Sequence, residues 1–149
     1  MLKEFIKSAI PWMDQYKKIQ KYYKKAHNQY NKGHKNLANF YAYRISKKYG
    51  CYISPKAELG ENFIFPHPIG IVIGEGVKIG NNCVIYQNVT LGRRNRDIFE
   101  YPTIGDNVII YSNATLVGDI YVGDGAVIGC NAVVLKSVDK NSICVGVVK

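Results

Sequence analysis

The chain has 149 residues, of which 47% are hydrophobic, and it carries a formal net charge of +9. This length can bury one hydrophobic core, whereas no apolar run approaches the roughly 20 residues that a membrane-spanning helix needs. The four cysteines are scattered without a C-x-x-C pair, which excludes the usual patterns of a zinc site or a disulfide framework. We therefore expect a soluble, cytoplasmic protein that binds no metal.

Residues 1–50 are predicted to form a short, basic helical hairpin. They contain twelve Lys and Arg against two acidic residues, whereas residues 51–149 are close to neutral. Lys, Tyr, Asn and Gln are frequent and β-branched runs are almost absent, which favours helices. One helix is expected from Pro11 to Tyr30 and a second over about residues 35–48.

A six-residue repeat dominates the rest of the chain. An aliphatic or aromatic residue returns every sixth position in three phased blocks: Ile53, Leu59 and Phe65; then Ile73, Ile79, Ile85 and Leu91; then Ile104, Ile110, Leu116, Val122, Ile128 and Val134. Neither a helical period of 3.6 nor a strand's alternation gives this spacing. A hexapeptide β-helix does, because each short strand buries little alone and stacks on the next coil. Residues 51–149 are therefore predicted to form a mainly β solenoid. The second helix is expected to pack on the first helix or on the end of the solenoid, where it would cover the open edge of the first coil.

The fourth residue after nearly every repeat position is also apolar and is expected to point inward. In the first coils these residues are Ala57, Phe63, Ile69, Val77 and Cys83. Many of them have small side chains, which suits the narrow interior of a coil.

Two breaks in the phase indicate where the coil departs from regularity. Phe65 and Ile73 are eight residues apart, so two extra residues enter around His67 and Pro68 and are expected to bulge outward. The segment 92–103 lacks apolar residues at the expected places and is predicted to be an extended loop. Loops held on a rigid scaffold are where functional residues concentrate.

The predicted loop carries Arg93, Arg94 and Arg96 close together. Guanidinium groups suit phosphate binding. Three arginines in a loop are equally often simply solvated, so the sequence leaves both interpretations open.

His67 is the only histidine in the repeat region, and it coincides with the bulge. If three repeats close one coil, Gln87 lies directly over His67 in the next coil. Glu61 and Glu75 then lie one corner away on either side and can reach His67 only across a subunit interface. We interpret His67 as a candidate proton acceptor rather than a surface residue without a role.

Four segments carry a resemblance to a known family. Residues 65–76, 85–92, 101–108 and 132–136 resemble the hexapeptide acyltransferases of the serine O-acetyltransferase type, and the resemblance covers about residues 50–147. It implies a left-handed, three-sided parallel β-helix and a homotrimer with active sites between subunits. It also implies that acetyl-coenzyme A is the acyl donor.

The resemblance also assigns roles to single residues. His67 falls on the family's general base, and Glu75 falls on the glutamate of a Gly-Glu motif near the site. The small residues that the resemblance places along the pantetheine arm of the donor are Gly92, Ala114 and Ala132. The cations expected near the coenzyme phosphates are Arg93 from the loop and Lys136 from the resemblance.

Three departures from the family pattern concern the acceptor. Serine acetyltransferases have Asp-Ile-His-Pro where this chain has residues 52–55, Asp-His where it has Pro66 and His67, and Arg-His-Pro where it has residues 100–102. The lost residues include the aspartate that partners the catalytic histidine and the groups that bind the ammonium and carboxylate of serine. Glu100 would repel a carboxylate instead of binding it.

These departures favour the branch of the family found in capsule and surface-polysaccharide gene clusters. We predict an acetyl-coenzyme A-dependent O-acetyltransferase that acts on a sugar hydroxyl of a cell-surface polysaccharide or its precursor. The residues expected to contact that glycan are Tyr52, Gln87, Glu100 and Tyr101. The alternatives are a serine O-acetyltransferase of cysteine biosynthesis and a non-catalytic trimeric scaffold.

The basic segment 1–50 suggests a further partner. A charge of this size on one segment favours contact with an anionic surface, and a solvated helix face explains it equally well. We expect the segment to contact the inner membrane face or the phosphate of a lipid-linked glycan, and we expect no nucleic-acid partner.

Overall fold

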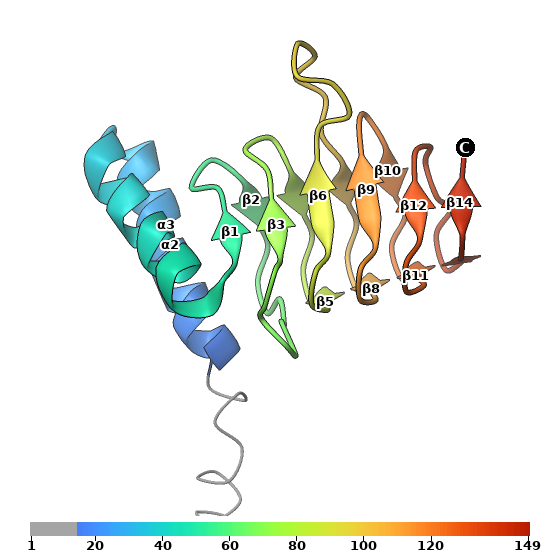
Figure 1. Cartoon of the computed structure of the whole chain (residues 1–149), viewed down its shortest axis with the longest axis horizontal. Helices are drawn as coiled ribbons and strands as arrows, with labels where there is room; N and C mark the ends of the chain where they lie inside the picture. The colour runs from blue at the N-terminus through green and yellow to red at the C-terminus, as the bar shows by residue number, and fades with distance from the viewer. Residues whose placement is uncertain (1–14) are drawn as a thin grey trace, which may run out of the picture.

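The computed structural model describes residues 15–149, which form two helices followed by stacked β-coils (Figure 1). The helices are α2 (Gln15–Asn31) and α3 (Lys35–Tyr49). The strands are β1 (Tyr52–Ile53), β2 (Glu58–Leu59), β3 (Val72–Ile73), β4 (Lys78–Ile79), β5 (Val84–Ile85), β6 (Thr90–Gly92), β7 (Thr103–Ile104), β8 (Ile109–Ile110), β9 (Thr115–Val117), β10 (Tyr121–Val122), β11 (Val127–Ile128), β12 (Val133–Val134), β13 (Ile143–Cys144) and β14 (Val147–Val148).

The strands make three parallel sheets, and the chain visits them in turn. Sheet A has the order β1-β3-β6-β9-β12-β14, sheet B the order β10-β7-β4-β2, and sheet C the order β13-β11-β8-β5. We name the three turns of each coil by the sheets that they join: the AB, BC and CA corners. The predicted mainly β solenoid with two preceding helices is confirmed.

Backbone hydrogen bonds between coils fix the register. Val72 lies beside Thr90 and Val133 beside Thr115, each pair eighteen residues apart. Eighteen residues are three six-residue repeats, so one strand per sheet and per coil follows from the sequence period. The inward side chains of all three sheets form one continuous core.

The bulge displaces one predicted core residue. Ile69 is 65% exposed, and Ile71 is fully buried in its place. Ile64 pairs with Val84, twenty residues on, whereas Val72 pairs with a residue eighteen on, so the two surplus residues leave the coil between these points. The inward phase therefore resumes at Ile71, and the prediction for Ile69 is wrong.

The predicted loop, like the bulge, consists of residues in excess of the six-residue repeat. Leu91 pairs with Leu116, twenty-five residues on, so the coil carries seven surplus residues. They leave the AB corner between β6 and β7 as the projecting arm seen in Figure 1. The bulge of residues 66–70 lies at the opposite end of sheet A, before β3.

Asparagines shape two of the three corners. Within residues 15–149, seven non-glycine residues have φ between 56° and 62°. All seven are asparagines, which tolerate this left-handed backbone best after glycine. At the BC corner the Asn62 side chain donates to Asn82, and Asn82 donates to Asn107, with distances of 3.2 and 3.4 Å. These side chains tie successive coils together outside the core.

Glycine is required where the coils approach most closely. A Cβ on Gly80 would lie 2.7 Å from the backbone carbonyl carbon of Gly105 in the next coil. Gly60 has the same relation to Gly80. The stacking distance of the coils therefore excludes side chains at these positions.

Helix α2 covers the open edge of the first coil. Tyr23 donates a 2.6 Å hydrogen bond to the Ala57 carbonyl and accepts one of 3.0 Å from the Leu59 N–H. The Gln20 amide donates to the Phe63 carbonyl. Polar groups of the first coil that would otherwise be an unpaired edge thus have partners. The edge is covered, but these contacts come from the first helix, whereas the sequence prediction named the second.

The helix bounds agree with the sequence prediction to within a residue where they are described. The first helix ends at Asn31, and the second spans Lys35–Tyr49. The predicted start at Pro11 lies outside the described residues. Ile19 and Ile45 belong to the same buried cluster as the coils, so the helices and the solenoid share one core.

Tyr23 should make stability depend on alkaline pH. Burial raises the pKa of Tyr23 to about 12, against about 10 in the unfolded chain. The raised pKa means that folding favours the neutral phenol, so its contribution is complete below pH 10 and is lost as the pH rises through 12. We expect the free energy of unfolding to fall by about 2 kcal/mol over this range.

Urea denaturation at pH 8, 10 and 12 measures this effect. Tyr23→Phe should cost about 1–3 kcal/mol at pH 8, because two backbone groups of the first coil lose a partner. The variant should also show a smaller decline between pH 10 and 12. An equal decline in both proteins would contradict the assignment.

Candidate active site

His67 lies on the bulge at the CA corner, with its side chain exposed. The backbone around it is held in place: the His67 carbonyl accepts a 2.8 Å hydrogen bond from the Ile69 N–H, and the Ile69 carbonyl accepts one of 2.9 Å from Asn88 in the next coil. The imidazole has no hydrogen-bond partner among residues 15–149. It is therefore available to a molecule outside the chain.

The neighbour of the imidazole is Tyr86. Its ring centroid lies 6.3 Å from that of His67, and Tyr86 stacks in turn on Tyr111 at 5.1 Å. The sequence places Gln87 over His67, but no hydrogen bond joins these two among the described residues. The Gln87 Oε1 atom is buried without a partner there.

A second cluster of predicted site residues lies at the AB corner. The Glu75 carboxylate accepts hydrogen bonds from Lys56 at 2.5 Å and from the Tyr101 hydroxyl at 3.3 Å. The hydrogen bond from Lys56 lowers the pKa of the Glu75 carboxyl. The Tyr101 ring lies against Gly74 and Gly76, where a Cβ would collide with it.

These residues border an open pocket of about 560 Å³ at the AB corner. Five charged side chains from several coils converge on it: Lys56, Lys78, Glu75, Glu100 and Asp119. The pocket thus offers groups of both signs within one small surface. Lys56 and Lys78 line this pocket together with Glu100, and the sequence-based expectation that Glu100 repels a carboxylate did not include them.

The structure does not unite the two predicted catalytic residues within one chain. His67 lies at the start of sheet A, and Glu75 lies at its end. Glu61 lies at the BC corner, the third of the coil. The predicted separation is confirmed, and a site that uses both His67 and Glu75 would need two chains.

Gly92 ends β6 and faces open space. A Cβ there would meet nothing within 4 Å, in contrast to Gly80. The fold of the single chain therefore does not require glycine at this position.

Ala114 and Ala132 point into the core, as the repeat predicts. Both side chains are completely buried in the solenoid core, because they occupy the second inward position of their repeats. Their side chains do not reach the surface of the single chain, and their place along the pantetheine arm stays a prediction.

The remaining predicted residues are dispersed. The Arg93 guanidinium lies over the Phe99 ring at 5.0 Å, and Lys136 is exposed at the AB corner beyond β12. Tyr52 is 51% exposed on the outer face of sheet A. The exposed candidates thus lie on the bulge, in the loop, on sheet A and at the AB corner.

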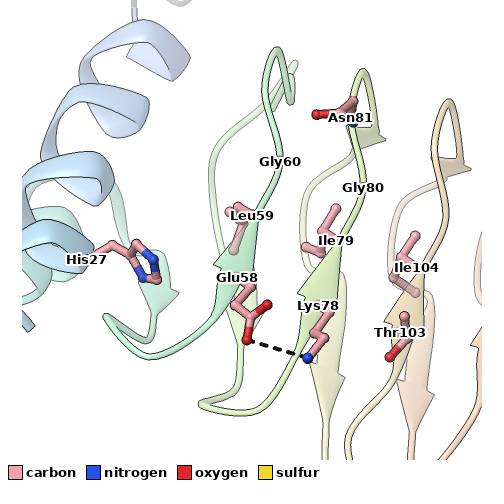
Figure 2. A pocket seen from close by; sticks show the side chains of 10 residues that line it. All are labelled: His27, Glu58, Leu59, Gly60, Lys78, Ile79, Gly80, Asn81, Thr103 and Ile104. Atoms are coloured by element: carbon pink, nitrogen blue, oxygen red, sulfur yellow. Dashed lines mark ion pairs between the residues drawn. The ribbon is translucent and has the colours of Figure 1, made fainter. Parts of the chain in front are cut away.

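Another pocket, of about 580 Å³, lies on the outer face of sheet B beside α2 (Figure 2). It contains the Glu58–Lys78 ion pair at 3.5 Å and none of the predicted site residues. His27, at its edge, donates from Nδ1 to the Pro55 carbonyl at 2.9 Å and so helps to fix α2 to the first coil. Across residues 15–149, no group of three or more His, Cys, Asp or Glu side chains is placed to hold a metal ion.

Comparisons with known proteins agree with this architecture. Residues 101–136 match the family model "Bacterial transferase hexapeptide (six repeats)". A serine acetyltransferase of Buchnera aphidicola subsp. Acyrthosiphon pisum (strain APS) is 39% identical over 127 residues, which are 84% of this chain and 46% of the relative. Serine acetyltransferase 2 of Arabidopsis thaliana is 36% identical over 93% of this chain and 43% of its own length. The chain belongs to the hexapeptide-repeat acyltransferases.

Solved structures of the family show the same fold. The crystal structure of Neisseria gonorrhoeae serine acetyltransferase superimposes with a TM-score of 0.85 at 35% identity, covering 89% of this chain and 51% of that one. A serine acetyltransferase in complex with CoA gives a TM-score of 0.79 at 34% identity, covering 84% and 52%. The chain thus spans about half the length of these acyltransferases.

The comparisons correct the predicted acceptor. The relatives and structures found are serine acetyltransferases, at 34–39% identity over most of this chain, so the prediction of a polysaccharide acetyltransferase is wrong. It rested on three short departures in sequence. Such departures show which side chains are missing at a site, not which acceptor replaces the usual one.

The predicted contact of the basic segment 1–50 with an anionic surface is a separate question. No helix within residues 15–149 is both long and apolar enough to cross a bilayer. The comparisons do not bear on contact of the segment with an anionic membrane surface, which stays a prediction.

Proposed function

We propose that this protein is an acetyl-coenzyme A-dependent serine O-acetyltransferase with His67 as its general base. The observation that carries the proposal is an exposed histidine, without a hydrogen-bond partner among residues 15–149, on the bulge of a scaffold that superimposes on serine acetyltransferases. A surface histidine without a role needs no such bulge. Acetyl-coenzyme A as donor agrees with the neighbour solved in complex with CoA.

The chemistry requires one proton acceptor and an oriented thioester. The imidazole of His67 takes the proton of the serine hydroxyl while the oxygen attacks the thioester carbonyl carbon. The carbon–sulfur bond then breaks, and the leaving thiolate recovers the proton from the imidazolium. The products are O-acetylserine and free coenzyme A.

The AB-corner pocket supports an amino-acid acceptor. Serine carries a carboxylate and an ammonium, and the pocket offers Lys56 and Lys78 for the first and Glu100 for the second. This arrangement offsets the loss of the usual serine-binding residues that the sequence shows. Tyr101, fixed by Glu75, would form one wall.

The proposal includes a left-handed coil and a trimer. In a trimer the CA corner of one chain faces the AB corner of its neighbour, which would bring His67 and the Glu75–Tyr101 cluster into one site. Glu75, Gly92, Arg93 and Lys136 would then lie near the donor or acceptor. The separation of the two clusters within one chain supports this arrangement.

His67→Ala should reduce acetyl transfer to L-serine by about 10²–10⁴-fold, because the proton acceptor is lost. Acetyl-coenzyme A binding and the oligomeric state should not change. Thiol release and calorimetric titration measure the two effects, and His34→Ala, at an exposed histidine between the helices, is the matched control. If the unaltered protein released no thiol with serine or with other hydroxyl acceptors, the non-catalytic scaffold would be restored.

Gly92→Ala should leave the melting temperature unchanged, because the added Cβ enters open space outside the chain. The same Cβ should obstruct the donor beside Gly92 and weaken binding of acetyl-coenzyme A by at least about tenfold. Gly80→Ala provides the contrast: its Cβ would overlap the next coil and cost about 1–3 kcal/mol of stability. Donor titration and thermal denaturation of both variants test the assignment. Unchanged donor affinity in Gly92→Ala would remove Gly92 from the site.

Mixed trimers test the shared site. Co-expression of His67→Ala and Tyr101→Ala chains should restore about one quarter of the wild-type activity, because one interface in four combines two intact halves when chains assemble at random. Differently tagged chains allow the mixed trimers to be purified. Each of these contains one intact interface out of three, so the purified species should show about one third of the wild-type activity. Activity no higher than that of the separate variants would place the whole site within one chain.

A further inference from the structure

The bulge that carries His67 is seated on the coil next to it at two points. Asn88 donates from its N–H to the Ile69 carbonyl, and its side chain fills the space beside Gly70, where a Cβ would collide with Oδ1. Asn88 in turn donates from its side chain to Asn113 at 3.0 Å. The end of the bulge is thus fixed by a column of polar side chains two coils deep.

A second column runs beside the first. Tyr86 precedes Asn88 by two residues and contacts the imidazole of His67, with centroids 6.3 Å apart and planes at 53°. This separation lies within the range of about 4.5–7 Å over which aromatic rings attract each other. Tyr86 is backed by Tyr111 at 5.1 Å and 24°, a stacked arrangement.

The imidazole lacks other support within the described residues. No hydrogen bond reaches it there, and Glu61 and Glu75 lie at other corners. An exposed histidine without a partner samples several side-chain orientations. Among the described residues, the Tyr86 ring is the group placed to restrict this freedom.

We propose that Tyr86, backed by Tyr111, is a positioning residue that holds the imidazole of His67 in the orientation required for proton transfer. The inference rests on the proposed function and supplies the group that orients His67. The ring, not the hydroxyl, makes the contact, so phenylalanine should substitute for Tyr86 and alanine should not.

Steady-state kinetics of four variants test the inference. Tyr86→Ala should lower kcat for serine acetylation about 10–100-fold with little change in KM for acetyl-coenzyme A, because a displaced catalytic group costs about this much. Tyr86→Phe should stay within about threefold of wild type. Tyr111→Ala should give an intermediate loss. Tyr121→Ala is the matched control, since Tyr121 is half exposed on sheet B.

The double variant separates positioning from a general structural effect. His67→Ala with Tyr86→Ala should be no slower than His67→Ala alone, because Tyr86 acts only through the imidazole. In the wild-type protein, nuclear Overhauser contacts should join the ring protons of His67 and Tyr86. The melting temperature of Tyr86→Ala shows whether the coils stay folded.

Three results would overturn the inference: wild-type kcat in Tyr86→Ala, a loss in Tyr86→Phe as large as that in Tyr86→Ala, or a further loss in the double variant. Each leaves the proposed function intact if His67→Ala is inactive. A wild-type protein that transfers no acetyl group to serine would instead overturn the proposed function, and this inference with it.

Discussion

Close stacking of the coils is the constraint on which the rest of this structure depends. Backbone hydrogen bonds run from coil to coil in all three sheets, and they bring Gly80 so near to Gly105 that no Cβ fits between them. A core packed at this spacing has no room for surplus residues, so they must leave at the corners. The bulge and the loop are the two insertions of surplus residues along sheet A, and both carry candidate site residues.

The same constraint distributes the candidate site over the surface of the coil. His67 and the Glu75–Tyr101 cluster occupy opposite ends of sheet A because the surplus residues leave the coil at opposite ends. Chemistry that needs both groups therefore depends on assembly. The Tyr86–Tyr111 column is different, because it lies within one chain. The orientation of the His67 imidazole that we propose it sets therefore does not depend on assembly.

The architecture could be predicted from the sequence because it depends on a period. Six-residue spacing gives the strands, the three sheets and the core, and the break in spacing gives the loop. The failures concern side-chain direction at the irregular points. Ile69 is exposed because the phase is lost inside the bulge, and Tyr86, not Gln87, contacts His67 for a related reason: the position of a residue beside a bulge is not set by the repeat.

Two further features could not be predicted because they depend on contacts between distant residues. Lys56 and Lys78 come near Glu100 only through the register of three coils, and without them Glu100 suggests the wrong acceptor. The asparagines at the corners were visible in sequence, two residues after several glycines. Their side-chain contacts depend on the register of successive coils, which brings Asn62 beside Asn82.

The variable length of the coils has a consequence for how such a protein changes over time. In sheet A, the spacing between paired residues is twenty from β1 to β3, eighteen from β3 to β6, twenty-five from β6 to β9, eighteen from β9 to β12 and fourteen from β12 to β14. Yet each pair of strands keeps the same parallel hydrogen bonding. Codons gained or lost at a corner therefore alter one turn and leave the buried residues in register. The corners that could contact a substrate can therefore change in length and sequence while the buried core and the pairing of the strands stay the same.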